Sequence, residues 1–174
     1  MNKLAFPLSI LLLLTLAACT QPSAPSQIAT KPSLPPDHDV VAAIRAAGTG
    51  MDSAVQVQPL RDPAIEGLLK QAHDAEVAKN YTTAADFAAK ALKLAPNAPD
   101  IIQYQAEIAA ARGNWKEAED FAIASYKLGP KVGSLCARNW QTVVEARTAL
   151  NDSATVTQAK QRLKECRVAA PVRM

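Results

Sequence analysis

Residues 80–96 read NYTTAADFAAKALKLAP, and residues 114–130 read NWKEAEDFAIASYKLGP. The second stretch repeats the first at a spacing of 34 residues, with eight of the seventeen aligned positions identical. Self-similarity at a fixed period of this size is the signature of a protein built from stacked structural repeats. The sequence therefore predicts a helical-repeat body around these two stretches.

Each 34-residue unit contains two predicted helices with recognisable end signals. Asp62 can cap the start of the first helix, and Pro63 suits its first position. The Gly-Asn pair at 113–114 separates the two helices of the second unit, and Gly129 ahead of Pro130 is placed to end that unit. The predicted helices cover about residues 62–79, 82–95, 97–113 and 114–129.

Small and aromatic residues recur at equivalent places in both units. The equivalent pairs are Ala72 and Ala106, Ala84 and Ala118, and Tyr81 and Trp115. With these residues and the Gly-Asn-Trp turn at 113–115, residues 65–130 resemble two tetratricopeptide repeats. The resemblance implies an all-α fold, a short right-handed α-solenoid in which the first helix of each hairpin lines a groove for a peptide or protein.

A third, less regular hairpin follows over residues 131–170. A helix from about residue 131 to 150 is predicted to meet a turn at 151–153, and a last helix runs to about Arg167. Trp140 occupies the slot in which the repeat family prefers a small residue. We interpret this unit as a terminal capping repeat, which gives about three hairpins in a domain of residues 61–174.

The first eighteen residues are predicted to be a secretion signal. A basic Lys3 precedes an apolar run over residues 4–16 that is too short to span a bilayer. The sequence Leu-Ala-Ala-Cys at 16–19 resembles the lipobox of bacterial lipoproteins. The resemblance implies a diacylglycerol and an N-acyl chain such as palmitate on Cys19, whereas the alternative is an ordinary signal peptide with a chance cysteine. No other cofactor is expected.

Thr20 bears on the destination of the lipoprotein. By the known sorting pattern, aspartate at this position retains a lipoprotein in the inner membrane, so threonine favours an anchor in the outer membrane that faces the periplasm. Residues 19–60 are predicted to be a Pro- and Ser-rich tether. It contains a short helix at 39–47, capped by Asp39 and ended by Gly48. The sequence leaves open whether residues 39–60 pack on the repeats.

Cys136 and Cys166 lie early in the first helix and late in the second helix of the third hairpin. Antiparallel helices place those ends side by side, and the compartments beyond the inner membrane are oxidising. We predict a disulfide between them, with two buried free thiols as the alternative. No metal site is predicted.

Catalytic motifs are not found in the sequence, which contains no nucleophile elbow, HExxH, CxxC or phosphate-binding loop. Only two histidines occur, His38 in the tether and His73 in the body. We therefore predict no catalytic residues and no enzyme. The formal net charge of +3 is too small to indicate nucleic-acid binding. Residues 131–174 nevertheless carry eight basic against three acidic side chains, which fits anionic lipid, an acidic partner or a merely solvated helix face.

The repeat resemblance also implies where a partner binds. Carried over to this chain, the groove positions are Glu66, Leu69, His73, Glu76, Asp100, Gln103, Tyr104, Glu107, Arg138, Gln141 and Glu145. This face is mostly acidic, with Tyr104 as a possible anchor, and its alternative interpretation is a plain solvated helix face.

Three hypotheses follow for the function. The first is an adaptor or scaffold that brings another envelope protein, such as an enzyme or assembly machine, to the membrane. The second is a pilotin-like assembly factor for a secretin or pilus system. The third, an enzyme or small-ligand binder, is disfavoured by the missing motifs.

Overall fold

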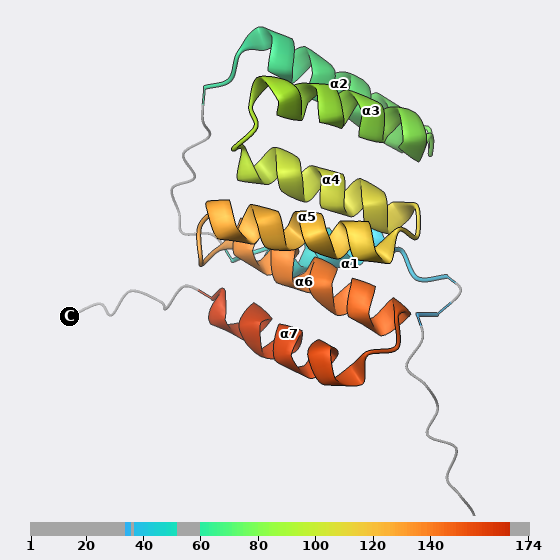
Figure 1. Ribbon diagram of the computed structural model, residues 1–174, viewed down its shortest axis with the longest axis vertical. Helices are drawn as coiled ribbons and strands as arrows, with labels where there is room; N and C mark the ends of the chain where they lie inside the picture. Colours follow the sequence, from blue (N-terminus) through green and yellow to red (C-terminus); the bar gives the residue numbers. More distant parts are fainter. Residues whose placement is uncertain (1–33, 36, 52–59, 168–174) are drawn as a thin grey trace, which may run out of the picture. The chain divides into compact units, whose positions relative to one another are not determined.

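The computed structural model describes residues 34–35, 37–51 and 60–167. Within these ranges the chain is all-α, as predicted (Figure 1). The helices are α1 (Val40–Gly48), α2 (Pro63–Val77), α3 (Tyr81–Leu94), α4 (Pro99–Ala111), α5 (Trp115–Leu128), α6 (Ser134–Ala149) and α7 (Ser153–Glu165). None of these helices is long and apolar enough to cross a membrane. The predicted signal peptide, Cys19 and the tether up to residue 33 lie outside the described residues.

Four helices begin at a side chain that accepts a hydrogen bond from the first turn. The capping residues are Asp39, Asp62, Asn80 and Asp152. At α7, the Thr155 hydroxyl donates to Asp152 at 2.6 Å and the Thr155 N–H donates at 3.1 Å. These two bonds, together with the nearby Arg147, lower the pKa of Asp152 from its ordinary value. The predicted caps at Asp39 and Asp62 are confirmed.

Each hairpin turns through one residue in the left-handed region of backbone conformation. These residues are Lys79 (φ 57°), Gly113 (φ 74°) and Asn151 (φ 60°). The next N–H in each turn donates to a carbonyl five residues earlier, as from Asn114 to Ala109 at 2.9 Å. Gly113 follows Lys79 by 34 residues, whereas Asn151 follows Gly113 by 38. The interval from the second turn to the third is therefore four residues longer than the repeat.

This extra length corrects the alignment of the third hairpin. In both repeats the small residue of the first helix lies seven positions before the turn residue, so its equivalent in α6 is Val144 rather than Trp140. Val144 is buried, while Trp140 is half-buried. The Trp140 ring packs edge-on against Tyr126 of α5, with centroids 5.1 Å apart. Trp140 thus fills space between hairpins and does not occupy the helix crossing.

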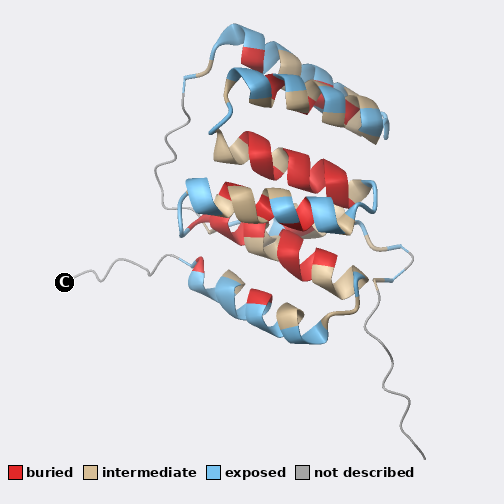
Figure 2. Ribbon diagram, in the orientation of Figure 1, coloured by how far each residue is buried: buried red, intermediate tan, exposed pale blue. Residues whose placement is uncertain are grey.

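Small residues make up most of the core. Ala72, Ala84, Ala106 and Ala118, the residues common to the two repeats, are all fully buried. Figure 1 shows α2 to α7 stacked in chain order, and α4 also contacts α6. Figure 2 shows burial concentrated on α4 and α6 in the middle of this stack. Alanine side chains suit this arrangement because they let helices approach closely.

Helix α1 packs on α4 and α6. Ile44 is fully buried, in a cluster with Ala109, Ala110 and Ala118. Gly48, the last residue of α1, lies so close to α6 that an added Cβ would stand 2.7 Å from the Ser134 hydroxyl oxygen and 3.1 Å from its carbonyl oxygen. The sequence left open whether residues 39–60 pack on the repeats, and the structure shows that α1 does. The domain boundary expected at residue 61 leaves out a helix that packs with the hairpins.

Gly129 ends α5 as predicted, but for a different reason. Its φ is −91°, so it does not use the left-handed conformation for which glycine is usually selected at a helix end. An added Cβ would stand 3.1 Å from Cβ of Pro99 and 3.2 Å from Cδ2 of Leu135. Close packing of three segments therefore favours glycine at this position.

Helix α7 is joined to the start of α6 by a disulfide. Cys136 and Cys166 are bonded, with their Cα atoms 5.6 Å apart, so the predicted bridge is present in the structure. Beside it, the Gly133 N–H donates to the Cys166 carbonyl oxygen at 2.7 Å. The bridge fixes the end of the last helix of the stack.

Candidate functional site

The predicted groove positions lie on α2, α4 and α6, and we call the surface that these helices turn toward α1 the inner face. At its centre is Glu107, whose side chain is fully buried. Its carboxylate accepts from Nε of Arg45 on α1 at 2.9 Å and from Nε of Arg138 on α6 at 2.8 Å. Nε2 of Gln103 donates to the same carboxylate at 3.2 Å. Two guanidinium groups from different helices thus offset the desolvation of one carboxylate.

Arg45 extends this network to α2. Its Nη2 lies 2.8 Å from Oε1 of Glu76, and the Tyr104 hydroxyl donates to Oε2 of Glu76 at 2.9 Å. Burial lowers the pKa of Arg45, but the carboxylates of Glu107 and Glu76 outweigh it and leave that pKa raised. Burial and the hydrogen bond to Glu76 raise the pKa of Tyr104 well above its ordinary value. At neutral pH, therefore, Arg45 is charged and Tyr104 is a neutral donor.

On α6 the network reaches Thr142, and a separate cluster surrounds Glu145. Gln103 Nε2 donates to the Thr142 hydroxyl oxygen at 2.9 Å, and that hydroxyl donates to the Arg138 carbonyl oxygen at 2.9 Å. Further along α6, the Glu145 carboxylate lies 2.9 Å from His38 Nε2 and accepts from Gln141 Nε2 at 2.6 Å. His38, two residues before α1, thus contacts α6 as well.

The structure gathers seven of the predicted groove residues into two clusters. Five belong to the network around Glu107: Glu76, Gln103, Tyr104, Glu107 and Arg138. The other two, Gln141 and Glu145, form a separate cluster with His38. The other four positions differ in their surroundings. Glu66 and Asp100 form ion pairs with Arg61, and Leu69 packs in the apolar cluster around Ile65. The His73 side chain is 62% exposed, with Nδ1 3.6 Å from Oε2 of Glu76.

Helix α1 therefore covers the part of the inner face where the repeat resemblance places a bound peptide. The alternative of a plain solvated face does not fit Gln103, Glu107 and Glu145, which are all buried. Binding of a partner by the exposed groove residues stays a prediction. Sequence reasoning did not find Arg45 as a residue of this site. The available signal was that Arg45 is the single charged residue in a nine-residue helix.

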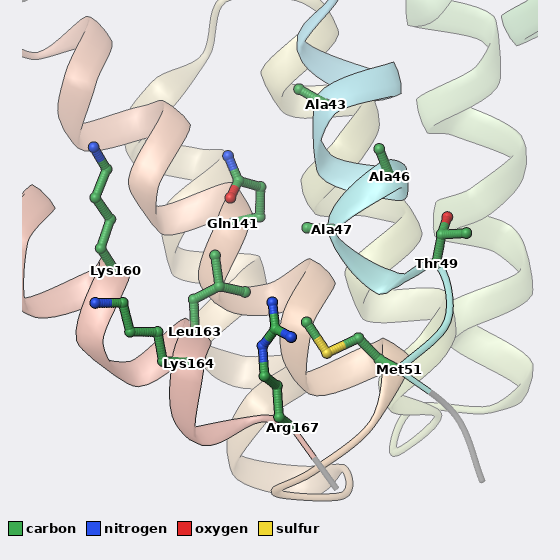
Figure 3. Close-up of a pocket in the computed structure, with 10 residues that line it drawn as sticks. All are labelled: Ala43, Ala46, Ala47, Thr49, Met51, Gln141, Lys160, Leu163, Lys164 and Arg167. Atoms are coloured by element: carbon green, nitrogen blue, oxygen red, sulfur yellow. The ribbon is translucent and has the colours of Figure 1, made fainter.

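A second feature lies between α1 and α7. An open cavity of about 480 Å³, which we call the α1–α7 trough, has α6 as its floor (Figure 3). Ala43, Ala46 and Ala47 of α1 face Leu163 of α7 across Gln141. The lining is completed by Thr49, Met51, Lys160, Lys164 and Arg167.

Lys160, Lys164 and Arg167 are exposed, and none of them forms an ion pair within the described ranges. The trough thus combines an alanine wall with a basic wall. A search for metal ligands over the same ranges finds no group of three or more His, Cys, Asp or Glu side chains that could hold an ion. The chemistry available at the trough is that of binding an anionic, partly apolar ligand.

The chain is similar to a solved structure, that of the globular C-terminal domain of LpoP from P. aeruginosa. Sequence identity is 25% and the TM-score is 0.57. The likeness covers 60% of this chain and 99% of that one. No protein-family model and no curated protein matches the chain. The helical body thus has a counterpart among bacterial proteins.

Proposed function

We propose that this protein is a lipoprotein of the outer membrane whose helical body binds another envelope protein, as an adaptor. The single observation that carries the proposal is the similarity of the helical body to the globular C-terminal domain of LpoP, with 99% of that domain covered. The lipobox at 16–19 and the Pro- and Ser-rich stretch ahead of α1 support the membrane anchor. A stack of helical hairpins supports binding, since such stacks present extended surfaces to partners.

The proposal also includes the type of hairpin. The 34-residue period, the buried alanines common to both units and the turn at Gly113 support tetratricopeptide-like repeats in α2 to α5. The partner is an envelope enzyme or assembly machine held near the membrane. Nothing in the comparisons supports the pilotin-like alternative, and we do not pursue it.

Replacement of Cys19 tests the anchor. Wild-type protein is expected to incorporate radiolabelled palmitate and to sediment with outer-membrane fractions, whereas Cys19→Ser is expected to lose the label and appear in the soluble periplasmic fraction. Cys136→Ser with Cys166→Ser is the matched control, because it replaces the other two cysteines by serine without touching the lipobox. Retention of the label and of membrane sedimentation by Cys19→Ser would refute the lipoprotein assignment.

A further inference from the structure

The exposed cations of the trough form a single stripe. Lys160 and Lys164 are spaced i, i+4 on one face of α7, and Leu163 lies on the same face. Arg167 follows two residues after the helix ends and lines the same side of the trough. Several other arginines of the helical body have carboxylate partners, as Arg45, Arg138 and Arg147 do. Three neighbouring cations with no carboxylate partner among the described residues are a local excess of positive charge.

The opposite wall of the trough is apolar. Ala46 is exposed, and Ala43 and Ala47 are half-buried, although α1 buries Ile44 on its other side. Helix α1 therefore has two apolar faces, one packed on the stack and one open to the trough. The side chains on this wall are short, which leaves room for a second chain to approach the helix closely.

We propose that the α1–α7 trough is the docking site for an acidic segment of the partner protein. This inference rests on the proposed adaptor function and deepens it by naming the surface and the chemistry of the partner. The segment places apolar side chains on Ala43, Ala46 and Ala47 and carboxylates on Lys160, Lys164 and Arg167. Charge complementarity is the argument for the occupant, because the cations of one wall lie beside an apolar wall and not beside acidic groups.

A peptide fits this site better than a lipid surface does. The cations line one side of a recess between three helices, whereas a flat anionic membrane is best met by cations on a protruding face. The recess of about 480 Å³ matches a few side chains of a peptide. Lipid contact is therefore treated as the competing outcome of the test.

The experiment is site-specific photo-crosslinking of the full-length lipoprotein in the bacterium that produces it. A photoreactive phenylalanine analogue replaces Ala46 in the trough or, in a separate strain, His73 on the exposed part of the inner face. Irradiated products are separated, and the attached segment is sequenced by mass spectrometry. The Ala46 position is expected to crosslink to a protein segment of net negative charge.

Two triple variants test the charge. Lys160→Glu, Lys164→Glu and Arg167→Glu together are expected to lower the crosslinking yield at Ala46 by about tenfold or more. The matched control reverses three exposed cations outside the trough, with Lys93→Glu, Arg112→Glu and Lys127→Glu, and is expected to change the yield less than about twofold. Both triples alter exposed side chains, and unchanged melting curves establish that they fold. Neutral Gln replacements in the trough are expected to give an intermediate yield.

Several outcomes would overturn the trough assignment. They are crosslinking at Ala46 to phospholipid alone, attachment to a segment without net negative charge, and equal yields from the two triple variants. Crosslinking of a protein at His73 with none at Ala46 would refute the trough and leave the adaptor function standing. Failure of both positions to crosslink any protein would count against the adaptor function itself.

Discussion

At the scale of single residues, Glu107 shows how one side chain connects distant parts of the chain. This buried carboxylate lies on α4 and binds Arg45 of α1 and Arg138 of α6, so one side chain connects three helices. The repeat resemblance marked the position because it faces the groove, but it indicated a contact with an outside partner. The pairing with α1 was not predictable from local sequence, since no periodicity or motif relates Arg45 to a residue 62 positions away.

Replacement of Glu107 by Ala is expected to lower the free energy of unfolding by about 2–3 kcal/mol. The replacement leaves two guanidinium groups without their central acceptor. The expected decrease in the free energy of unfolding is smaller than the about 3–5 kcal/mol for breaking a fully buried pair, because both arginines are partly exposed to water. Urea denaturation followed by circular dichroism measures it. Asp86→Ala, at an exposed acidic residue of α3, is the control and is expected to change stability by less than about 0.5 kcal/mol.

Lys79 affects stability through its backbone conformation. It adopts a φ of 57° at the turn where the next repeat has Gly113, and a side chain disfavours that conformation. We expect Lys79→Gly to raise the free energy of unfolding by about 0.5–1 kcal/mol, with part of the gain offset by greater freedom in the unfolded chain. The converse change, Gly113→Ala, is expected to lower it by about 1 kcal/mol. Thermal melts of both variants measure these changes in stability. A Lys79→Gly variant less stable than the wild type would contradict the claim that Lys79 is strained.

At the scale of helices, the sequence predicted which segments form helices, but it predicted only in part where these helices pack. Asp62 with Pro63, and the repeated turns, are local signals, and the predicted helix starts agree with the structure to within a few residues. The short helix after Asp39 was also predicted. Its position on α4 and α6 was not, because an amphipathic pattern indicates that a helix has an apolar face but not which helices that face packs on. The sequence indicated Gly48 and Gly129 only as helix ends. Their close packing against other segments was not predictable, because a single sequence does not show which residues meet in space.

Two glycines allow a matched test of how α1 docks. Gly48→Ala places a methyl group against Ser134 and is expected to loosen α1, so that its amides exchange with solvent about tenfold faster or more. Gly67→Ala, in α2 with open space around the position, is expected to stabilise its helix by about 0.5–1 kcal/mol. Hydrogen exchange read by mass spectrometry separates the two effects. Unchanged exchange of α1 in Gly48→Ala would mean that the close contact with α6 is not needed.

At the scale of the whole molecule, burial is uneven along the stack. Helix α4 has nine buried residues and α2 has two, Ile65 and Ala72. Helix α4 contacts α3, α5, α6 and α1, whereas α2 packs mainly on α3. Repeat stacks unfold in units that depend on their neighbours, so the first hairpin has the least support.

Native-state hydrogen exchange is therefore expected to show that the helices differ in the free energy at which their amides open to solvent. Amides of α2 and α3 should open at a free energy at least about 1 kcal/mol below those of α4. The same labelling experiment after reduction of the Cys136–Cys166 bond is expected to lower protection in α7 and to leave α2 nearly unchanged, because the bridge lies at the other end of the stack. A uniform loss of protection across all helices would contradict this order.

The position of α1 also decides how the protein should be handled at the bench. A fragment that begins at residue 61, where the repeats begin, lacks Arg45 and opens the buried carboxylate of Glu107 to solvent. Used as bait, such a fragment would attract basic proteins and free peptides to a surface that the intact chain keeps closed, and these would be false positives. A fragment that starts at residue 34, ahead of the Asp39 cap, retains the native surface and is the form to use when partners are sought.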